Sequence, residues 1–405
     1  MLTPQQLSNK PSFTFFLAAM VAITPFSIDA YMPVLPEMAA SLNTDLAAVT
    51  LTMSSYFAGL AIGQLIGGPL SDQLGRKTIG LTGLLLFIAT SIAIASSNNV
   101  ENIQTLRIFQ AIGSGFASVI CMAQVRDVYP AAQAPKKFAN IMLVMLIAPI
   151  IAPPIGIVIS VLGWQAIFVF LAFYGTLLVV SYAFFFPETN ANQAEKFSVS
   201  ELGTGYWRAI SMRTNGKLIA LRYAIFGSLT SGVFLAYLTS LSFIFVDHFG
   251  YTKIEFALLF GLNGLALMVG NRLSAFLMDK AAPQAILKAG NLSQISLLVM
   301  LILISYSALP NMLTVLITFT MITFVAGTIA PITSGHFIGL HEKNLGSASS
   351  LLSTLVFAFG ALIGGVVAGL SDGDLLPIFG IMLFALLVAN RVVYKACKLE
   401  LQPII

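Results

Sequence analysis

The feature that most constrains this 405-residue chain is a series of apolar runs, each long enough to cross a lipid bilayer as a helix. One crossing needs about 20 mostly apolar residues. Hydrophobic residues make up 58% of the chain and charged residues only 9%, against about 25% charged residues in soluble domains. Because lipid offers no hydrogen-bond partners to an open sheet edge, the runs predict an all-α, multi-pass membrane protein.

Twelve transmembrane helices can be placed on these runs, and the polar segments between most of them are short. An even number of crossings puts both termini on the same side of the membrane. The predicted spans are 13–35, 47–70, 78–97, 102–125, 138–162, 164–186, 217–245, 253–278, 284–308, 311–335, 345–369 and 375–394.

The basic residues indicate which side of the membrane the termini occupy. Alternate loops carry bases such as Arg76, Lys77, Lys136 and Lys137, whereas the opposite loops hold only Lys253. Lys and Arg are enriched in cytoplasmic loops, so both termini are predicted to be cytoplasmic. The scattered bases also account for the net charge of +4 without a nucleic-acid partner.

The longest polar loop, residues 187–216, separates two halves of similar length. We therefore predict an N-terminal six-helix bundle over 1–186, a cytoplasmic loop over 187–216 and a C-terminal six-helix bundle over 217–405. This hydropathy symmetry is typical of transporters whose halves move around a central site. The loop itself is interpreted as a tether.

An acid in the first predicted span and a base in the fourth are candidates for a functional role. Asp29 lies sixteen residues after Phe13, roughly 24 Å along a helix, and an ionised carboxylate costs at least about 2.5 kcal/mol at the membrane centre. We expect it to face a polar cavity and to exchange protons; the alternative is a helix-end residue in outside water. Arg107 keeps its charge and needs an anion, water or carbonyl groups. It is predicted to line the cavity and influence Asp29, or else to fix helix packing or lie near the outer interface.

Glycine and proline mark two spans in particular. Gly59, Gly63 and Gly67 recur every four residues and predict close contact with another helix. The fifth span contains three prolines within Ala148–Gly156. Prolines bend a helix and free carbonyl groups, which is tolerable only against protein or water.

A turn between the second and third spans carries a specific motif. The pattern G-x-L-S-D-x-x-G-R-K resembles the loop between helices 2 and 3 of major facilitator superfamily transporters, and R-x-x-Q-x-x-G-x-G from Arg107 resembles a signature of that superfamily in helix 4. The resemblance implies a cytoplasmic gate in which Asp72 caps the positive end of the eleventh span when the inside is closed, and Arg76 holds Asp72 by a charge-assisted hydrogen bond. A topology signal is the alternative. The gating residues so implied are Gly68, Asp72, Gly75, Arg76 and Lys77, with Arg126 and Asp127 as a similar latch.

Further stretches resemble the bicyclomycin/chloramphenicol-resistance (Bcr/CflA) branch of drug:proton antiporters with twelve spans. They are Asp29-Ala30-Tyr31-Met32-Pro33, the Arg126-Asp127 pair, the prolines of the fifth span, residues 163–168 and residues 236–239. The resemblance implies the bacterial inner membrane. The chain departs from this branch at Ser242, where proline is common, and at Ile157, where a second glycine is common. These departures bear on the drug spectrum and the gating detail and leave the predicted fold unchanged.

Substrate contacts are predicted from side chains that adapt to different shapes, mainly aromatic residues and methionines. Phe26, Asp29 and Met32 are expected on one helical face because they are three residues apart. Packing or lipid contact is the alternative for each candidate. The predicted substrate-binding residues are Phe26, Tyr31, Met32, Tyr56, Gln64, Met142, Met145, Tyr237 and Asn263.

The predicted function is proton-coupled efflux of small, mostly apolar or amphipathic compounds, similar to phenicols or bicyclomycin. Proton-coupled uptake or metabolite export on the same fold is the alternative. An enzyme is disfavoured because His248, His336 and His341 form no H-E-x-x-H motif and no G-x-S-x-G motif occurs. The expected partners are a small-molecule substrate, protons and the bilayer, with no metal, cofactor or nucleic acid, and a monomer is expected.

Overall fold

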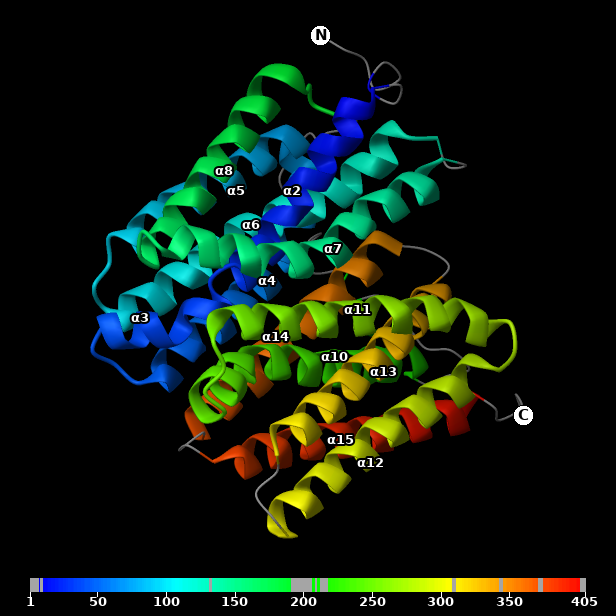
Figure 1. Cartoon of the computed structure of the whole chain (residues 1–405). Coiled ribbons are helices and arrows are strands. Elements are labelled where there is room, and N and C mark those ends of the chain that lie inside the picture. Colours follow the sequence, from blue (N-terminus) through cyan, green and yellow to red (C-terminus); the bar gives the residue numbers. More distant parts are fainter. Residues whose placement is uncertain are drawn as a thin grey trace. The chain divides into compact units, whose positions relative to one another are not determined.

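The computed structural model contains only helices and the segments that join them, over the residues it describes (Figure 1). These are residues 7, 10–130, 133–190, 206–207, 210–211, 218–307, 311–341, 345–370 and 374–400. The chain divides into two compact units, Met1–Leu202 and Gly203–Ile405. Most of the predicted loop 187–216 lies outside the described residues.

In the described part of the chain, 12 helices are long and apolar enough to cross a membrane, which confirms the predicted fold class. The first crossing, Pro11–Ser41, is formed by three consecutive segments. In the first unit the elements are α2 (Pro11–Asp29), η1 (Met32–Val34), α3 (Leu35–Ser41), α4 (Leu46–Leu74), α5 (Arg76–Ala95), α6 (Val100–Val128), α7 (Ala134–Ser160) and α8 (Gln165–Phe185).

The second unit repeats the pattern of long apolar helices. Its first helix continues without interruption into a π-helical turn, and α11 begins with a capping box between Thr252 and Glu255. The elements are α10 (Ile219–Ser242), η2 (Phe243–His248), α11 (Lys253–Met278), α12 (Pro283–Ser307), α13 (Met312–Gly339), α14 (Leu345–Leu370) and α15 (Leu375–Glu400).

The glycines of α4 permit close packing against α6. A Cβ atom added to Gly59 would collide with the carbonyl oxygen of Ile108, and one added to Gly63 would lie 2.7 Å from that of Ile112. Small residues allow helix backbones to approach in this way. The close contact predicted from the glycine spacing is therefore present between α4 and α6.

The turn predicted around the G-x-L-S-D motif is much shorter than expected. Helix α4 continues through Pro69 to Leu74, and α5 begins at Arg76, so that only Gly75 separates the two helices. Gly75 has φ +97°, a conformation that residues with a Cβ atom rarely adopt. The change in direction needs one glycine, and the acid and the bases of the motif lie on helices.

Candidate functional site

Asp29 is the last residue of α2, where the first crossing changes from an α-helix to a short irregular segment. After Ala30 and Tyr31 the chain continues as η1 and α3. The Asp29 residue is only 4% exposed although it ends a helix. Because Met32 starts η1, the helical face predicted for Phe26, Asp29 and Met32 is continuous only between the first two.

Helix α7 meets α2 immediately beside Asp29. A Cβ atom added to Gly156 would collide with the carbonyl oxygen of Ala30, so the backbones of the two elements touch at this point. Pro149, Pro153 and Pro154 all lie inside α7, which runs without interruption from Ala134 to Ser160. The proline and glycine motif of the fifth span therefore belongs to the same site as the intramembrane acid.

Arg107 is the most deeply buried cation of this site, with 0% exposure. Its Nη1 donates to Gln110 Oε1 at 2.6 Å, and its Nη2 donates to the carbonyl oxygen of Ser27 at 3.0 Å. Its Nε has no hydrogen-bond acceptor among the described residues. Both acceptors are uncharged oxygen atoms. They form hydrogen bonds with the guanidinium but do not neutralise its charge.

Aromatic rings surround the Arg107 guanidinium. Its Cζ lies 4.5 Å from the ring centroid of Tyr31, 4.2 Å from that of Tyr56 and 5.7 Å from that of Phe168. Such cation–π contacts are worth about 2 kcal/mol when the cation is desolvated. They hold the charge in place without a carboxylate.

Hydroxyl groups fix two of these rings. The Tyr31 and Thr52 hydroxyls are 3.1 Å apart, and the Tyr56 and Ser114 hydroxyls are 2.7 Å apart. Tyr31 of the first crossing is thereby joined to α4, and Tyr56 of α4 is joined to α6. We name Arg107 with its ring partners Tyr31, Tyr56 and Phe168 the Arg107 cage.

No ion pair joins Arg107 to Asp29 in the described structure. The connection is through the main chain, since Arg107 binds the carbonyl of Ser27, two residues before the acid. Any influence of the guanidinium on the carboxyl therefore acts over a longer distance than a direct contact.

The remaining predicted substrate residues are distributed over both units. Phe26 lies beside Tyr174 with ring centroids 6.1 Å apart, Gln64 is buried on α4, and Met142 and Met145 are half-buried on α7. In the second unit, Tyr237 Oη donates to Asn263 Oδ1 at 3.3 Å and its ring stacks on Phe319 at 4.2 Å. That pair forms a separate buried cluster in its own unit.

The residues predicted to form a gate come together at the junction of α4, α5 and α6. Arg76 pairs with Asp72 at 2.5 Å and with Asp127 at 3.1 Å, and its Nη1 donates to Ser71 Oγ at 2.6 Å. Arg126 is exposed on α6 and is not one of these partners. Of the two residues predicted to form a latch, Asp127 joins this network through its ion pair with Arg76.

Glu188 is a member of this network that the sequence did not predict. Its carboxylate accepts hydrogen bonds from the backbone N–H groups of Arg76 and Lys77, both at 2.9 Å. An acid at the start of a helix also meets the positive end of the helix dipole. Glu188 was assigned to a tether, because nothing in its neighbourhood indicates a partner more than 100 residues earlier.

Among the described residues, no group of three or more His, Cys, Asp or Glu could hold a metal ion. Long apolar helices in two units, with a buried acid and a buried arginine in one of them, are typical of secondary transporters. The Major Facilitator Superfamily description matches residues 15–389, and the chain belongs to this family. It is a multi-pass membrane transporter and not an enzyme.

Relatives with this length include proteins named for drug resistance. The chain is 29% identical to an MFS-type transporter named YdgK of Bacillus subtilis over 96% of both chains. It is 26% identical to a bicyclomycin resistance protein homolog of Haemophilus influenzae, covering 91% of this chain and 92% of the relative. It is 29% identical to a chloramphenicol resistance protein of Pseudomonas aeruginosa, covering 70% and 68%.

Solved structures share the fold at low sequence identity. A D-xylose-proton symporter matches with a TM-score of 0.73 and 14% identity, covering 95% of this chain and 98% of the symporter. At this identity the similarity supports the fold and carries no information about the substrate.

Proposed function

We propose that this transporter is a proton-coupled antiporter that exports small, mostly apolar or amphipathic compounds, similar to phenicols or bicyclomycin, from the bacterial cytoplasm. It would work by alternating access in the inner membrane, as a monomer with both termini in the cytoplasm. The observation that carries the proposal is Asp29, a carboxyl group buried within the first crossing. Ionisable groups in this position are costly and are usually functional.

In this mechanism Asp29 binds a proton from the outside and releases it inside, while substrate moves outward. The uncompensated charge of Arg107 favours an anion or a dipole in the site, so it favours the ionised carboxyl and the release of its proton. Inward movement of one charge yields about 2.3 kcal/mol per 100 mV of membrane potential. Gly156 of α7 contacts Ala30, the residue after Asp29, so a movement of α7 would also move the chain at the acid.

Export is favoured over uptake by two observations. The relatives named for bicyclomycin and chloramphenicol resistance suggest removal of a drug from the cell. The side chains around Arg107 are mainly aromatic, whereas a sugar or amino-acid carrier needs more hydrogen-bonding groups. In uptake by proton symport on the same fold, the substrate and the proton would move in the same direction.

The test uses the full chain in proteoliposomes loaded with radiolabelled chloramphenicol. A proton gradient that drives protons into the vesicles, while the drug leaves them, should accelerate drug release by the wild type. Asp29→Asn should lose this acceleration while remaining folded and inserted. Asp45→Asn is the matched control, because Asp45 is an exposed acid that precedes α4 in the same unit, and it should behave as the wild type.

Wild-type gradient dependence in Asp29→Asn would end the proposal. A gradient that accelerates drug movement only in the direction of proton flow would show symport instead.

A further inference from the structure

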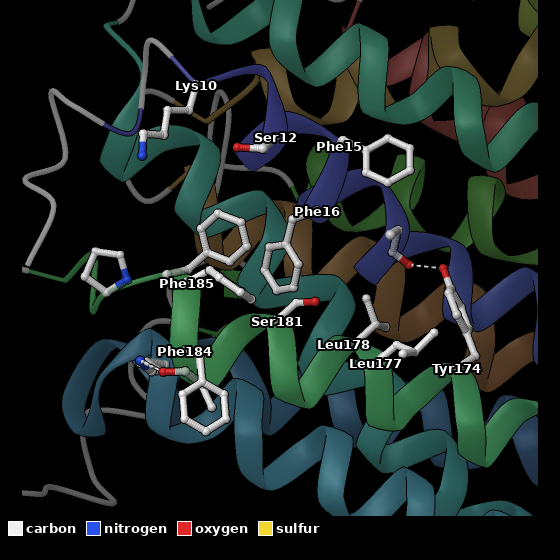
Figure 2. Close-up of a pocket in the computed structure, with 15 residues that line it drawn as sticks. Lys10, Ser12, Phe15, Phe16, Tyr174, Leu177, Leu178, Ser181, Phe184 and Phe185 are labelled. Atoms are coloured by element: carbon white, nitrogen blue, oxygen red, sulfur yellow. Dashed lines mark hydrogen bonds between the residues drawn. The ribbon is translucent and has the colours of Figure 1, made fainter.

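A groove lies on the first unit between the first turns of α2 and the last turns of α8. Its volume is about 760 Å³. Figure 2 shows Phe16 of α2 facing Ser181 and Phe185 of α8, with Lys10 near one end and Tyr174 at the other. We name it the α2–α8 groove.

The groove has the length of one lipid leaflet. Its α8 wall runs from Tyr174 to Phe185, which is roughly 16 Å of helix at 1.5 Å per residue. The hydrocarbon core of a bilayer is about 30 Å thick, so one leaflet is about 15 Å. The far end is closed where the Tyr174 hydroxyl donates to the carbonyl oxygen of Ala19 at 2.7 Å (Figure 2).

The walls of the groove are apolar, and its aromatic rims are exposed. Phe15 is 77% exposed and Phe184 is 80% exposed. Most of the other lining residues are Leu, Phe or Ala. A hydrocarbon chain would therefore contact aromatic and aliphatic side chains along its length.

Among the described residues, two cations and no acid line the same groove. Lys10 immediately precedes α2 and is exposed. Lys77 Nζ donates to the carbonyl oxygen of Ala183 at 2.8 Å, which uses one of its three N–H groups. Glu188, the acid that follows the groove in sequence, is hydrogen-bonded to the N-terminal amides of α5.

We propose that the α2–α8 groove binds an anionic phospholipid, with the phosphate at Lys10 and Lys77 and one acyl chain between the α2 and α8 phenylalanines. The positive charge at one end and the leaflet-length apolar wall together fit this amphiphile. The topology proposed above places the bound lipid in the cytoplasmic leaflet. An electrically neutral lipid or a drug entering from the bilayer would use the apolar wall but would not require the two lysines.

The test places a tryptophan reporter in the groove by Phe184→Trp. The protein is put into phosphatidylcholine nanodiscs that contain increasing fractions of brominated phosphatidylglycerol or brominated phosphatidylcholine, which quench tryptophan on contact. The signal of the parent protein, from Trp164 and Trp207, is subtracted. Phe384→Trp is the control reporter, because Phe384 is exposed on α15, lies outside the groove and has no lysine or arginine within six residues in sequence.

At Phe184→Trp the glycerol lipid should quench at a lower fraction than the choline lipid. One basic residue near an anionic bilayer surface contributes about a fivefold preference. Lys10→Gln should therefore lower the preference about fivefold, and Lys10→Gln with Lys77→Gln should abolish it. Lys136→Gln, which removes an exposed charge from α7, should leave it unchanged.

Equal quenching by the two lipids with both lysines present would overturn the proposal. So would a preference that survives the double substitution, or an equal preference at Phe384→Trp. Full recovery of fluorescence on addition of chloramphenicol would also overturn it, because it would indicate a drug path. Because the Lys10 side chain makes no hydrogen bond or ion pair with a described residue, Lys10→Gln remains informative if the double variant does not fold. Quenching does not depend on transport, so failure of proton coupling would leave this result intact.

Discussion

Arg76 and Arg107 are both buried arginines of the first unit, and the structure surrounds them very differently. Arg76 forms ion pairs with Asp72 and Asp127. Arg107 has an amide oxygen, a backbone carbonyl and aromatic faces. The first arginine is neutralised by its neighbours, whereas the second forms no ion pair with any described residue.

This difference separates a structural junction from a responsive site. A paired arginine at a helix junction holds elements together, because each partner satisfies the other. An arginine without a counter-ion keeps its attraction for any anion that appears nearby, including an ionised carboxyl group. Replacing Arg107 should therefore affect transport most, and replacing the partners of Arg76 should affect mainly stability.

The largest effect is expected at Arg107. Arg107→Lys keeps the charge but loses the planar group that lies between two rings and reaches Gln110, so transport should fall roughly 100-fold or more. The measurement is chloramphenicol efflux from cells at matched expression. Arg391→Lys is the control, because Arg391 is exposed on α15, and it should transport normally. Near-normal efflux in Arg107→Lys would show that charge alone is sufficient.

The second effect is expected at Gly156, where α7 touches the chain beside Asp29. An alanine methyl group there would collide with the backbone of Ala30, so α7 must move away. We expect transport to fall about tenfold or more, on the scale of a 1 to 3 kcal/mol overpacking penalty. Gly261→Ala is the matched control, because an added Cβ would meet no described atom within 4 Å.

Gly261→Ala should leave transport unchanged and slightly raise thermal stability, since alanine is favoured over glycine in a helix by about 0.5 to 1 kcal/mol. Equal behaviour of the two alanine variants would contradict the close contact between α7 and the acid.

A smaller effect is expected at the Arg76 junction, and here it should appear as lost stability. Asp127 is 22% exposed and Asp72 is 64% exposed at the side chain. Asp127→Asn should lower the free energy of unfolding by about 1 to 2 kcal/mol, and Asp72→Asn by less than about 1 kcal/mol, because exposed pairs are weak. Thermal unfolding in detergent measures both. A larger loss of stability from Asp72→Asn than from Asp127→Asn would contradict this prediction and make Asp72 the main partner of Arg76.

Much of the fold was predictable because the bilayer imposes a length on every apolar run. The predicted span 253–278 coincides with α11, and the span 375–394 starts at the residue where α15 starts. The largest differences between the predicted spans and the observed helices are at helix ends, because a helix can continue through polar residues. The α4–α5 junction shows this, since the polar residues 71–73 are helical and α4 ends only at Leu74, before Gly75.

The site was predictable only in part. Charge at membrane depth identified Asp29 and Arg107 without a structure, because such residues are costly. The partners of Arg107 were harder to predict from the sequence. Ser27 contributes a backbone carbonyl, and Phe168 is one of many phenylalanines in the chain. Glu188 illustrates the same limit, since its partners depend on how α8 ends beside α5.

The smallest expected effect separates the two functions of Tyr56, which covers Arg107 with its ring and binds Ser114 through its hydroxyl. Tyr56→Phe removes only the hydrogen bond and should lower the free energy of unfolding by about 1 kcal/mol. Tyr56→Leu also removes the ring face and should lose a further ~1 to 2 kcal/mol, because the cation is desolvated. Thermal unfolding and efflux are measured on both variants. If the cage holds an uncompensated charge, only Tyr56→Leu should reduce efflux strongly, whereas equal efflux in the two would mean that Gln110 and Ser27 hold the guanidinium without the rings.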